Sequence, residues 1–520
     1  MLKKISLIIL SVFIILIVFV SCNNIPTGCE HDWVEAGCET AKTCSICEAV
    51  EGKPLGHTYS EEENKCTRCD LKYSDKLEFA KYDDSDTYYV KRLRECKDEE
   101  IIIPPIYQGC RVTGIGSSAF FNREHITKVV IPDGVTNIDN LAFSECRGLT
   151  TVIIPDSVTS IGNAAFQFCT SLKEIDLPKG LIHLGARAFL DCTSLTSIVI
   201  PDKITVIEEE TFSNCSGLVD VVIPNSVVSI NDAVFRGCSY LQSITIPCSV
   251  QSIGYSVFEY CLSLKNINVD ENNENYSSVD GNLFSKDKTM FIKYAAGKEA
   301  TSFTVPQNVK KIEKGAFENS KNLTSVIIQD GVESIENWVF YYCTKLVSVT
   351  IPDSVTSIGN HAFANCESLV NLNIPNSVIH IGESAFSYCM NIESINIPNG
   401  VTVIEKNTFN YCKALVNITI PDSVTSIGDS AFSNCHSLVS IVIPNGIKKI
   451  GKEALQNCQS LVSITIPNGV TMIGNYAFDG CSSMKDVYYK GTENEWYRII
   501  RGSGNQCLND VTIHYNYKPE

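Results

Sequence analysis

Four cysteines near the N-terminus have the spacing of a metal site. Cys44 and Cys47 form one C-x2-C pair, Cys66 and Cys69 form another, and 18 residues separate the two pairs. A C-x2-C turn aims two thiolates at one point, so two such turns complete the tetrahedron that Zn2+ prefers. The sequence predicts a zinc-ribbon-like module at 29–69 that holds a structural Zn2+. Disulfides, which export favours, and free thiols are the alternatives.

The N-terminus carries a candidate lipidation site. Two lysines precede an apolar run at 7–20, which is about 14 residues long and therefore suits a signal-peptide core better than a membrane span. Ser21 and Cys22 follow, and a small residue before cysteine resembles a bacterial lipobox, although Phe19 replaces the usual Leu or Val. We predict that 1–21 is a cleaved signal peptide and that the lipid on Cys22 anchors the chain to a membrane. An uncleaved N-terminal anchor is the alternative.

The elements that follow these cysteines are internal repeats. Proline, phenylalanine and cysteine each recur every 23 residues, as in the copies LTTVIIPDSVTSIGNAAFQFCTS at 149–171 and LVNITIPDSVTSIGDSAFSNCHS at 415–437. Self-similarity at a fixed period indicates an array of stacked units. The cysteines of this period are Cys146, Cys169, Cys192, Cys215, Cys238, Cys261, Cys343, Cys366, Cys389, Cys412, Cys435, Cys458 and Cys481.

Each unit divides into parts with different backbone preferences. The segment L-x-x-[IV]-x-[IV]-P predicts a short strand of β-branched residues that ends at proline, which cannot donate to a strand ladder. A D-S-V or N-G-V turn, a second extended piece V-x-x-I-G and a tight helical corner A-F-x-x-C follow. One such coil cannot enclose a core, but stacked coils bury a continuous one. The predicted fold is therefore a solenoid of short parallel β-strands with short helical corners.

This pattern resembles the BspA-like leucine-rich repeat, a 23-residue class found in bacterial surface proteins. The resemblance covers residues 101–515 and rests on many copies of the unit. It implies a right-handed leucine-rich-repeat solenoid that is displayed at the bacterial cell surface. The role that it implies is adhesion to protein or glycan of the host matrix or of other cells.

Departures from the period divide the chain into parts. At 264–299 the period is lost, and NLFSK and TMFIKY around Asp287-Lys288 predict a hairpin that projects from the stack. The predicted parts are a signal peptide at 1–21, a lipid-anchored linker at 22–28, the Cys-rich module at 29–69, a linker with room for one hairpin at 70–100, an N-terminal repeat block with its cap at 101–263, the hairpin insert at 264–299, a C-terminal repeat block at 300–483 and a C-terminal cap at 484–520.

The composition and motifs argue against several function classes. The 520-residue chain has 42 Lys and Arg against 59 Asp and Glu, and its formal charge of -17 opposes binding to phosphate backbones. The motifs H-E-x-x-H, G-x-S-x-G and G-x-x-x-x-G-K-[ST] do not occur, and the eight histidines are scattered. We predict neither nucleic-acid binding nor catalysis.

Exposed places of the repeat supply candidate ligand-binding residues. Small uncharged residues occupy outward places on the first strand, and aromatic residues precede several corner cysteines. The candidates are Thr350, Asn373, Asn396 and Thr419 on the strands, and Tyr342, Tyr388 and Tyr411 at the corners. The polar residues could bind protein or glycan through many hydrogen bonds, and the aromatic residues could form an adhesive ridge. Alternatively, the polar residues are solvated surface and the rings cover the corner turns.

The corner cysteines are predicted to pack as small apolar residues, because parallel side chains on successive coils do not suit the torsion of a disulfide. Cys248 and Cys507 lie outside the period and have no predicted role. The function that these observations favour is that of a cell-surface lipoprotein whose solenoid is a binding platform for extracellular protein or glycan. The alternative is a structural envelope or spacer protein without a specific ligand.

Overall fold

The computed structural model describes residues 72–370 and 372–518, together with the backbone of five short strands nearer the N-terminus. The chain divides into two compact units, Met1–Asp75 and Lys76–Glu520. The first unit holds two antiparallel sheets, ordered β1-β2-β3 and β4-β5. Their strands are β1 (Trp33–Val34), β2 (Lys42–Cys44), β3 (Val50–Glu51), β4 (Tyr59–Ser60) and β5 (Lys65–Cys66).

The side chains that would form the zinc and lipid sites lie outside the described residues. Only the backbone of Cys44, at the end of β2, and that of Cys66, at the end of β5, is described. The zinc site at Cys44, Cys47, Cys66 and Cys69, its disulfide alternative and the lipidation of Cys22 therefore stay predictions.

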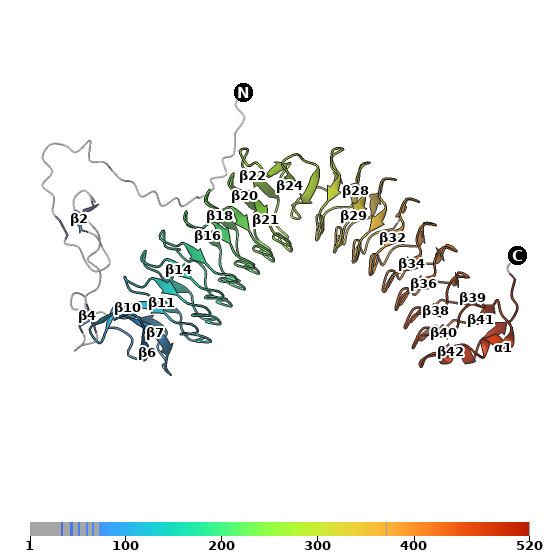
Figure 1. The fold of residues 1–520 in the computed structure, drawn as a ribbon, viewed down its shortest axis with the longest axis horizontal. Coiled ribbons are helices and arrows are strands. Elements are labelled where there is room, and N and C mark those ends of the chain that lie inside the picture. The colour runs from blue at the N-terminus through green and yellow to red at the C-terminus, as the bar shows by residue number, and fades with distance from the viewer. Residues whose placement is uncertain are drawn as a thin grey trace, which may run out of the picture. The chain divides into compact units, whose positions relative to one another are not determined.

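The second unit is a solenoid in which coils contribute short parallel strands to two rows (Figure 1). A residue pairs with the one 23 positions later, as Lys128 does with Thr151 and Ser357 with His380. The first row contains β8 (Glu100–Ile102), β11 (Lys128–Val130), β13 (Thr151–Ile153), β16 (Ser197–Val199), β18 (Asp220–Val222), β20 (Ser243–Ile246), β22 (Asn266–Val269), β26 (Ser302–Thr304), β28 (Ser325–Ile327), β30 (Ser348–Thr350), β33 (Ser394–Asn396), β35 (Asn417–Thr419), β37 (Ser440–Val442), β39 (Ser463–Ile466), β41 (Asp486–Tyr489) and β43 (Thr512–His514). The predicted solenoid of short parallel strands is confirmed.

The second row runs along the other extended piece of each coil. It contains β10 (Cys110–Ile115), β12 (Asn137–Ile138), β14 (Ser160–Ile161), β15 (His183–Leu184), β17 (Val206–Ile207), β19 (Ser229–Ile230), β21 (Ser252–Ile253), β25 (Met290–Lys293), β27 (Lys311–Ile312), β29 (Ser334–Ile335), β31 (Ser357–Ile358), β32 (His380–Ile381), β34 (Val403–Ile404), β36 (Ser426–Ile427), β38 (Lys449–Ile450), β40 (Met472–Ile473) and β42 (Ile500–Arg501). β9 (Ile106–Tyr107) pairs antiparallel with β10.

Alternation within most strands points aliphatic side chains into the core. In β16, Ser197 and Val199 are exposed and Ile198 between them is buried, which is the period-two pattern of a half-buried strand. Stacking these residues produces two hydrophobic core clusters. The clusters meet at the insert, where Leu283 belongs to one and Phe284 to the other.

The corners between strands are successive turns, in place of the short helices that the sequence predicts. Each regular corner contains two residues with positive φ, four positions apart, such as Leu141 (58°) and Glu145 (62°). Alternate N–H groups bond across coils, because the N–H of Phe143 donates to the carbonyl of Ala165 at 2.7 Å while that of Ser144 turns back to Leu141 at 3.1 Å. A helix would keep all of these bonds within one coil. Contact between coils therefore decides the corner conformation.

Phenylalanine and cysteine form two buried columns along the corners. Successive rings from Phe120 to Phe258 stack nearly parallel, with centroids between 4.8 and 6.2 Å apart. Each corner thiol donates to a carbonyl of the preceding coil, as Cys389 does to Phe363 at 3.2 Å. Burial raises the pKa of the Cys389 thiol well above its ordinary value, so thiolate chemistry is suppressed. These contacts make the cysteine column a part of the core.

Cys507, to which the sequence assigns no role, extends this column into the C-terminal cap. Its thiol donates to the carbonyl of Phe478 at 3.2 Å, although 29 residues separate the two where the repeat has 26. The short helix η1 (Gln506–Asn509) carries Cys507 to the place that a repeat cysteine would take. The cap also contains α1 (Glu493–Trp496), and the ring of Trp496 is buried.

Two segments that the sequence places outside the stack belong to its core. β6 (Leu77–Lys81) and β7 (Tyr88–Leu93) form an antiparallel hairpin within the expected linker at 70–100, and Val90 and Leu93 are fully buried. In the insert, β23 (Tyr276–Val279) and β24 (Asn282–Ser285) pair antiparallel, and β25 returns the chain to the second row. The expected projecting hairpin lies in the stack instead, because Phe284 and Phe291 are buried between the repeat blocks.

Replacing Cys389 with serine should lower the free energy of unfolding by about 1–3 kcal/mol. The smaller hydroxyl must be desolvated, and its acceptor, the carbonyl of Phe363, is placed for a sulfur donor at 3.2 Å. Denaturant unfolding of the full chain measures the change. Cys248→Ser is the control, because that half-buried thiol lies outside the column, 3.7 Å from the side chain of Asn225. An equal loss in both variants would contradict a specific role for the column.

Candidate ligand-binding site

The strand candidates lie on an exposed face of the first row. Thr350, Asn396 and Thr419 are exposed in β30, β33 and β35, and Asn396 pairs directly with Thr419. Asn373 is also exposed, although it does not belong to a strand. The face is less uniformly polar than the sequence candidates suggest, because aliphatic residues hold the same place in other coils. These exposed residues are Ile153, Val199, Val222, Ile327 and Val442.

The corner tyrosines Tyr342, Tyr388 and Tyr411, here called the tyrosine row, occupy one place in the repeat. Tyr388 and Tyr411 stack with ring centroids 4.4 Å apart and an interplanar angle of 6°. Tyr342 is 36% exposed and lies two coils before Tyr388, with Asn365 at the equivalent place between them. The structure therefore brings two of the three predicted rings into contact and leaves the third apart from them.

The tyrosine row occupies backbone positions that disfavour tyrosine. Tyr342, Tyr388 and Tyr411 have φ values of 57°, 60° and 59°, in the left-handed region, which costs most residues about 1–2 kcal/mol. Asparagine and glycine adopt this region readily. They hold the equivalent place in eight other corners, as Asn122, Asn214, Gly237, Asn319, Asn365, Asn434, Asn457 and Gly480, while Glu145, Phe168, Asp191 and Tyr260 hold it in four more. Tyrosine at these places lowers stability while it adds a partly exposed ring, a pattern that suggests a binding surface.

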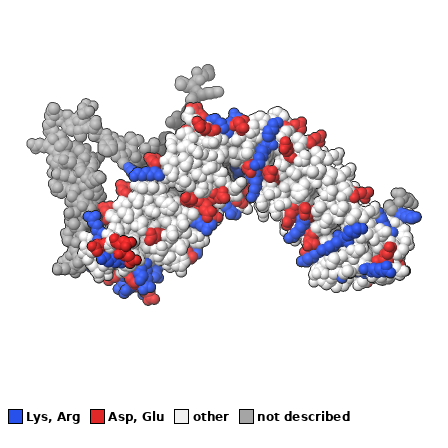
Figure 2. Space-filling model, viewed as in Figure 1, with Lys and Arg blue, Asp and Glu red and all other residues white. Residues whose placement is uncertain are grey.

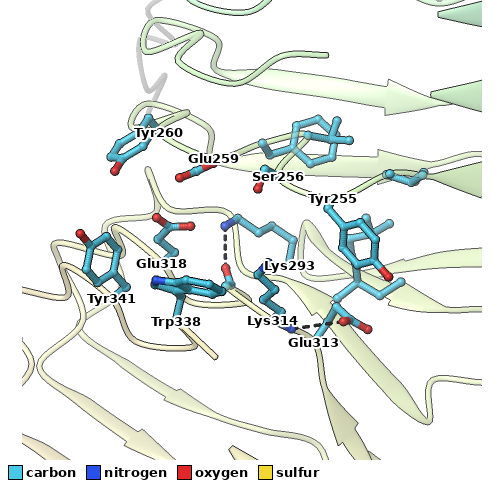
Figure 3. Close-up of a pocket in the computed structure, with 17 residues that line it drawn as sticks. Tyr255, Ser256, Glu259, Tyr260, Lys293, Glu313, Lys314, Glu318, Trp338 and Tyr341 are labelled. Carbon is cyan, nitrogen blue, oxygen red and sulfur yellow. Dashed lines mark hydrogen bonds between the residues drawn. The ribbon is translucent and has the colours of Figure 1, made fainter. Parts of the chain in front are cut away.

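A cavity of about 350 Å³ lies where the insert interrupts the succession of corners (Figure 3). One wall is the corner at 253–260, and the opposite wall is the corner at 313–318 with Trp338 and Tyr341 of the next coil. Residues of the insert, including Lys293, lie between the two walls. We call this cavity the junction pocket. Its volume falls within the range of ligand sites, roughly 300–1,000 Å³.

Aromatic rings and a lysine line one end of the junction pocket. Nζ of Lys314 lies 4.4 Å from the ring centroid of Trp338 and 5.9 Å from that of Tyr255, so the ammonium contacts rings of both walls. On its other side Trp338 stacks on His361, with centroids 5.7 Å apart. Gly315, with a φ of 65°, takes the corner place that Trp338 and His361 hold in the next two coils. Because Gly315 has no side chain, the pocket stays open beside Trp338.

The other end of the junction pocket holds two carboxyls at equivalent corner places. Glu318 is only 8% exposed, and burial raises the pKa of its carboxyl to about 7, although the ammonium of Lys293 lowers it. The nearby charge of Glu259 raises the same pKa. Glu259 also pairs with Arg236 at 3.2 Å, and Nζ of Lys293 donates to the carbonyl of Gly315 at 2.7 Å. The charges of Arg236 and Lys293 therefore compensate those of the two carboxyls.

The two carboxyls affect each other, since the charge of Glu259 raises the pKa of the Glu318 carboxyl. Among the described residues, no group of three or more His, Cys, Asp and Glu side chains could hold a metal ion. The aromatic walls and compensated charges of this pocket suit the binding of a ligand.

Sequence reasoning does not identify the junction pocket. Its walls lie on opposite sides of the insert, so the repeat pattern does not indicate which corners face each other. The signal that could have found it is the loss of the period at 264–299 together with Gly315, which stands where other corners carry a side chain.

Charges of both signs are interspersed on the visible face of the solenoid, with wide uncharged areas between them (Figure 2). In the part of the chain that the structure describes, no helix has the length and apolar character needed to cross a bilayer.

Comparisons with known proteins agree with this architecture. A family model described as BspA type Leucine rich repeat region matches residues 92–219, 207–297, 293–416 and 402–498. The solved structure of a leucine rich cell surface protein from Faecalibacterium prausnitzii is 28% identical, covers 83% of this chain and 97% of its own, and has a TM-score of 0.50. A leucine-rich repeat protein from Bacteroides ovatus is also 28% identical, covers 85% and 98%, and has a TM-score of 0.48. No curated protein matches the chain.

Proposed function

Because this chain belongs to the BspA-type leucine-rich repeat family, we propose that it is a bacterial cell-surface lipoprotein whose solenoid binds an extracellular protein or glycan. The observation that carries the proposal is the tyrosine row. Its three rings stand at left-handed backbone positions where eight other corners use asparagine or glycine and only four use another residue. A spacer would need only length, and nothing in a spacer would favour bulky rings at these places. The similar protein from Faecalibacterium prausnitzii is described as a cell surface protein, which supports the proposed location.

The double variant Tyr388→Asn/Tyr411→Asn should lose at least about tenfold in affinity for the ligand while its stability stays within about 1 kcal/mol of the parent. Loss of the stacked pair, worth about 0.5–1.5 kcal/mol, is offset because asparagine adopts the left-handed region more readily. The ligand is first found by screening the parent against arrays of matrix proteins and glycans. Binding is then measured by biolayer interferometry and stability by denaturant unfolding.

Phe168→Asn is the matched control, because Phe168 holds the same corner place with a φ of 60° but lies in the N-terminal repeat block. It should leave binding unchanged. If the double variant binds as the parent does, the tyrosine row is not the contact surface. If the parent binds nothing on either array, the chain is better explained as a spacer.

Cys22→Ala should abolish the incorporation of a clickable fatty acid when the chain is expressed in a bacterium with a lipoprotein pathway. The proposed anchor depends on one thiol, since lipidation would make Cys22 the first residue of the mature chain. The labelled protein is detected after gel separation. Cys29→Ala, seven positions later in the sequence, should label as the parent does. Labelling that persists in Cys22→Ala would rule out the lipoprotein assignment.

A further inference from the structure

Regular corners are joined by a fixed set of three backbone hydrogen bonds. In the corner at 233–237, the N–H groups of Ala233, Phe235 and Gly237 donate to carbonyls of the next coil at 2.9, 3.1 and 2.7 Å. The same three places donate in the same way in the other regular corners from Ser118 to Asn457. Three N–H groups, two residues apart, therefore point from each coil toward the coil that follows.

One corner departs from this rule. The N–H groups of Ser256, Phe258 and Tyr260 hold the same three places, yet within residues 72–370 and 372–518 none of them donates a hydrogen bond. The insert follows this corner where the next coil would lie, and the ladder resumes only when the N–H of Tyr294 donates to the carbonyl of Ala316 at 2.8 Å. All three residues line the junction pocket.

The C-terminal end of the array shows how such donors are otherwise satisfied. Where the last corner has no following coil, the N–H of Tyr476 donates to the carbonyl of Ser503 at 2.6 Å, and that of Phe478 donates to Oδ1 of Asn505 at 3.0 Å. The cap thus supplies acceptors to the end of the ladder. Unpaired backbone donors are rare in folded proteins, and an unpaired row of them is a template for another chain.

We propose that the junction pocket binds an uncharged peptide segment whose backbone carbonyls accept hydrogen bonds from Ser256, Phe258 and Tyr260. The spacing of the donors carries this inference. In other corners the same three donors are matched by polypeptide carbonyls two residues apart, whereas a glycan offers no such two-residue repeat of acceptors. Main-chain bonds of this kind supply affinity, and side-chain pockets beside them supply specificity.

The side chains around the donors favour an uncharged segment. Tyr255 is 64% exposed and, with Tyr260, offers aromatic surface to the side chains of the peptide. Glu259 is paired with Arg236, Lys293 is held by a backbone carbonyl, and the ammonium of Lys314 lies over the rings of Trp338 and Tyr255, so each of these charges already has a partner in the protein. No residue of the tyrosine row lines the junction pocket, although Tyr341 of the pocket contacts Tyr342 of the row, and the test uses different variants.

The first test needs no ligand. In hydrogen–deuterium exchange with single-amide resolution, Ser256, Phe258 and Tyr260 should exchange about tenfold or more faster than the equivalent amides of the preceding corner, because they lack acceptors. Equal protection in the two corners would overturn the proposal, since the donors would then already be paired.

The second test identifies the partner class. The full chain is used to select binders from a phage-displayed library of random peptides, and selected peptides are synthesised and measured by fluorescence anisotropy. They should slow exchange of the amides of Ser256, Phe258 and Tyr260. Gly315→Trp should weaken their binding about tenfold or more, because the ring would enter the pocket beside Trp338. The backbone accepts the change, since Trp338 has a φ of 58° at the equivalent place, and the added Cβ meets only the side chain of Glu318, with its carboxyl oxygen at 3.2 Å.

Asn407→Trp is the matched control, because it places the same ring at the same corner place, with a φ of 56°, in a regular corner. It should leave peptide binding unchanged. Tyr255→Ala, at an exposed position, should weaken binding even if Gly315→Trp unfolds. Selection of no peptide, peptides that are indifferent to both pocket variants, or protection of the three amides by a glycan instead would each overturn the proposal.

Discussion

Phe386→Ala should lower the free energy of unfolding by about 3–5 kcal/mol, the largest loss expected from a single substitution in the array. The ring is fully buried, and it stacks on Phe363 and Phe409 with centroids 5.4 and 5.6 Å apart. Truncation removes both contacts and leaves a cavity in the middle of the column. Neighbouring coils cannot close this cavity, because their register is held by hydrogen bonds on both sides.

Denaturant unfolding of the full chain measures this loss, and Phe478→Ala is the matched control. Phe478 is equally buried at the same corner place, but the preceding coil carries Leu455 there, and the C-terminal cap follows. An end coil can unfold locally while the rest of the array stays folded, so the loss of unfolding free energy should be smaller. If both variants lose the same free energy of unfolding, the middle coils contribute no more to the stability of the array than the end coil does. If Phe386→Ala costs nothing, the phenylalanine column is not the core.

Glu318→Gln should raise the free energy of unfolding by about 1–3 kcal/mol at pH 8. Burial raises the pKa of the Glu318 carboxyl to about 7 in the folded chain, against an ordinary value of 4.5. The folded state therefore binds the proton more tightly than the unfolded state does. The contribution of this group to stability is complete below about pH 4.5 and is lost as the pH rises through 7. Glutamine stays uncharged at every pH, so the variant keeps this contribution to stability at pH 8.

The measurement is denaturant unfolding of parent and variant between pH 5 and pH 8. The difference between the two should be small at pH 5 and grow toward pH 8. Glutamine already stands at the equivalent corner place as Gln167 and Gln456, so the corner accepts its shape. Glu333→Gln is the control, because that side chain is exposed. Its difference from the parent in unfolding free energy should not increase with pH. A difference that does not change with pH would mean that Glu318 stays charged in the folded chain.

The regular part of the fold could be predicted from the sequence because every coil repeats the same local pattern. Parallel stacking at a period of 23 residues places equivalent side chains next to one another. A repeated Phe or Cys therefore becomes a buried column, and a repeated Tyr becomes a neighbour of the next one, as Tyr388 is of Tyr411. The candidate positions on the strands and corners follow from the same rule.

Two kinds of feature were decided by the tertiary structure alone. In the first, another coil supplies the hydrogen-bond partner, and in the second, the 23-residue period fails. The pattern A-F-x-x-C predicts a helix locally, but bonds to the next coil turn the corner into successive turns with positive φ. Cys507 reaches the cysteine column outside the period, because η1 shortens the path. Glu259 and Glu318 face each other, and the donors of the corner at 256–260 stay unpaired among the described residues, because the insert packs into the core without forming a corner beside them. Side-chain periodicity determines neighbours only while the period holds, so the junction pocket arises from packing that no local pattern encodes.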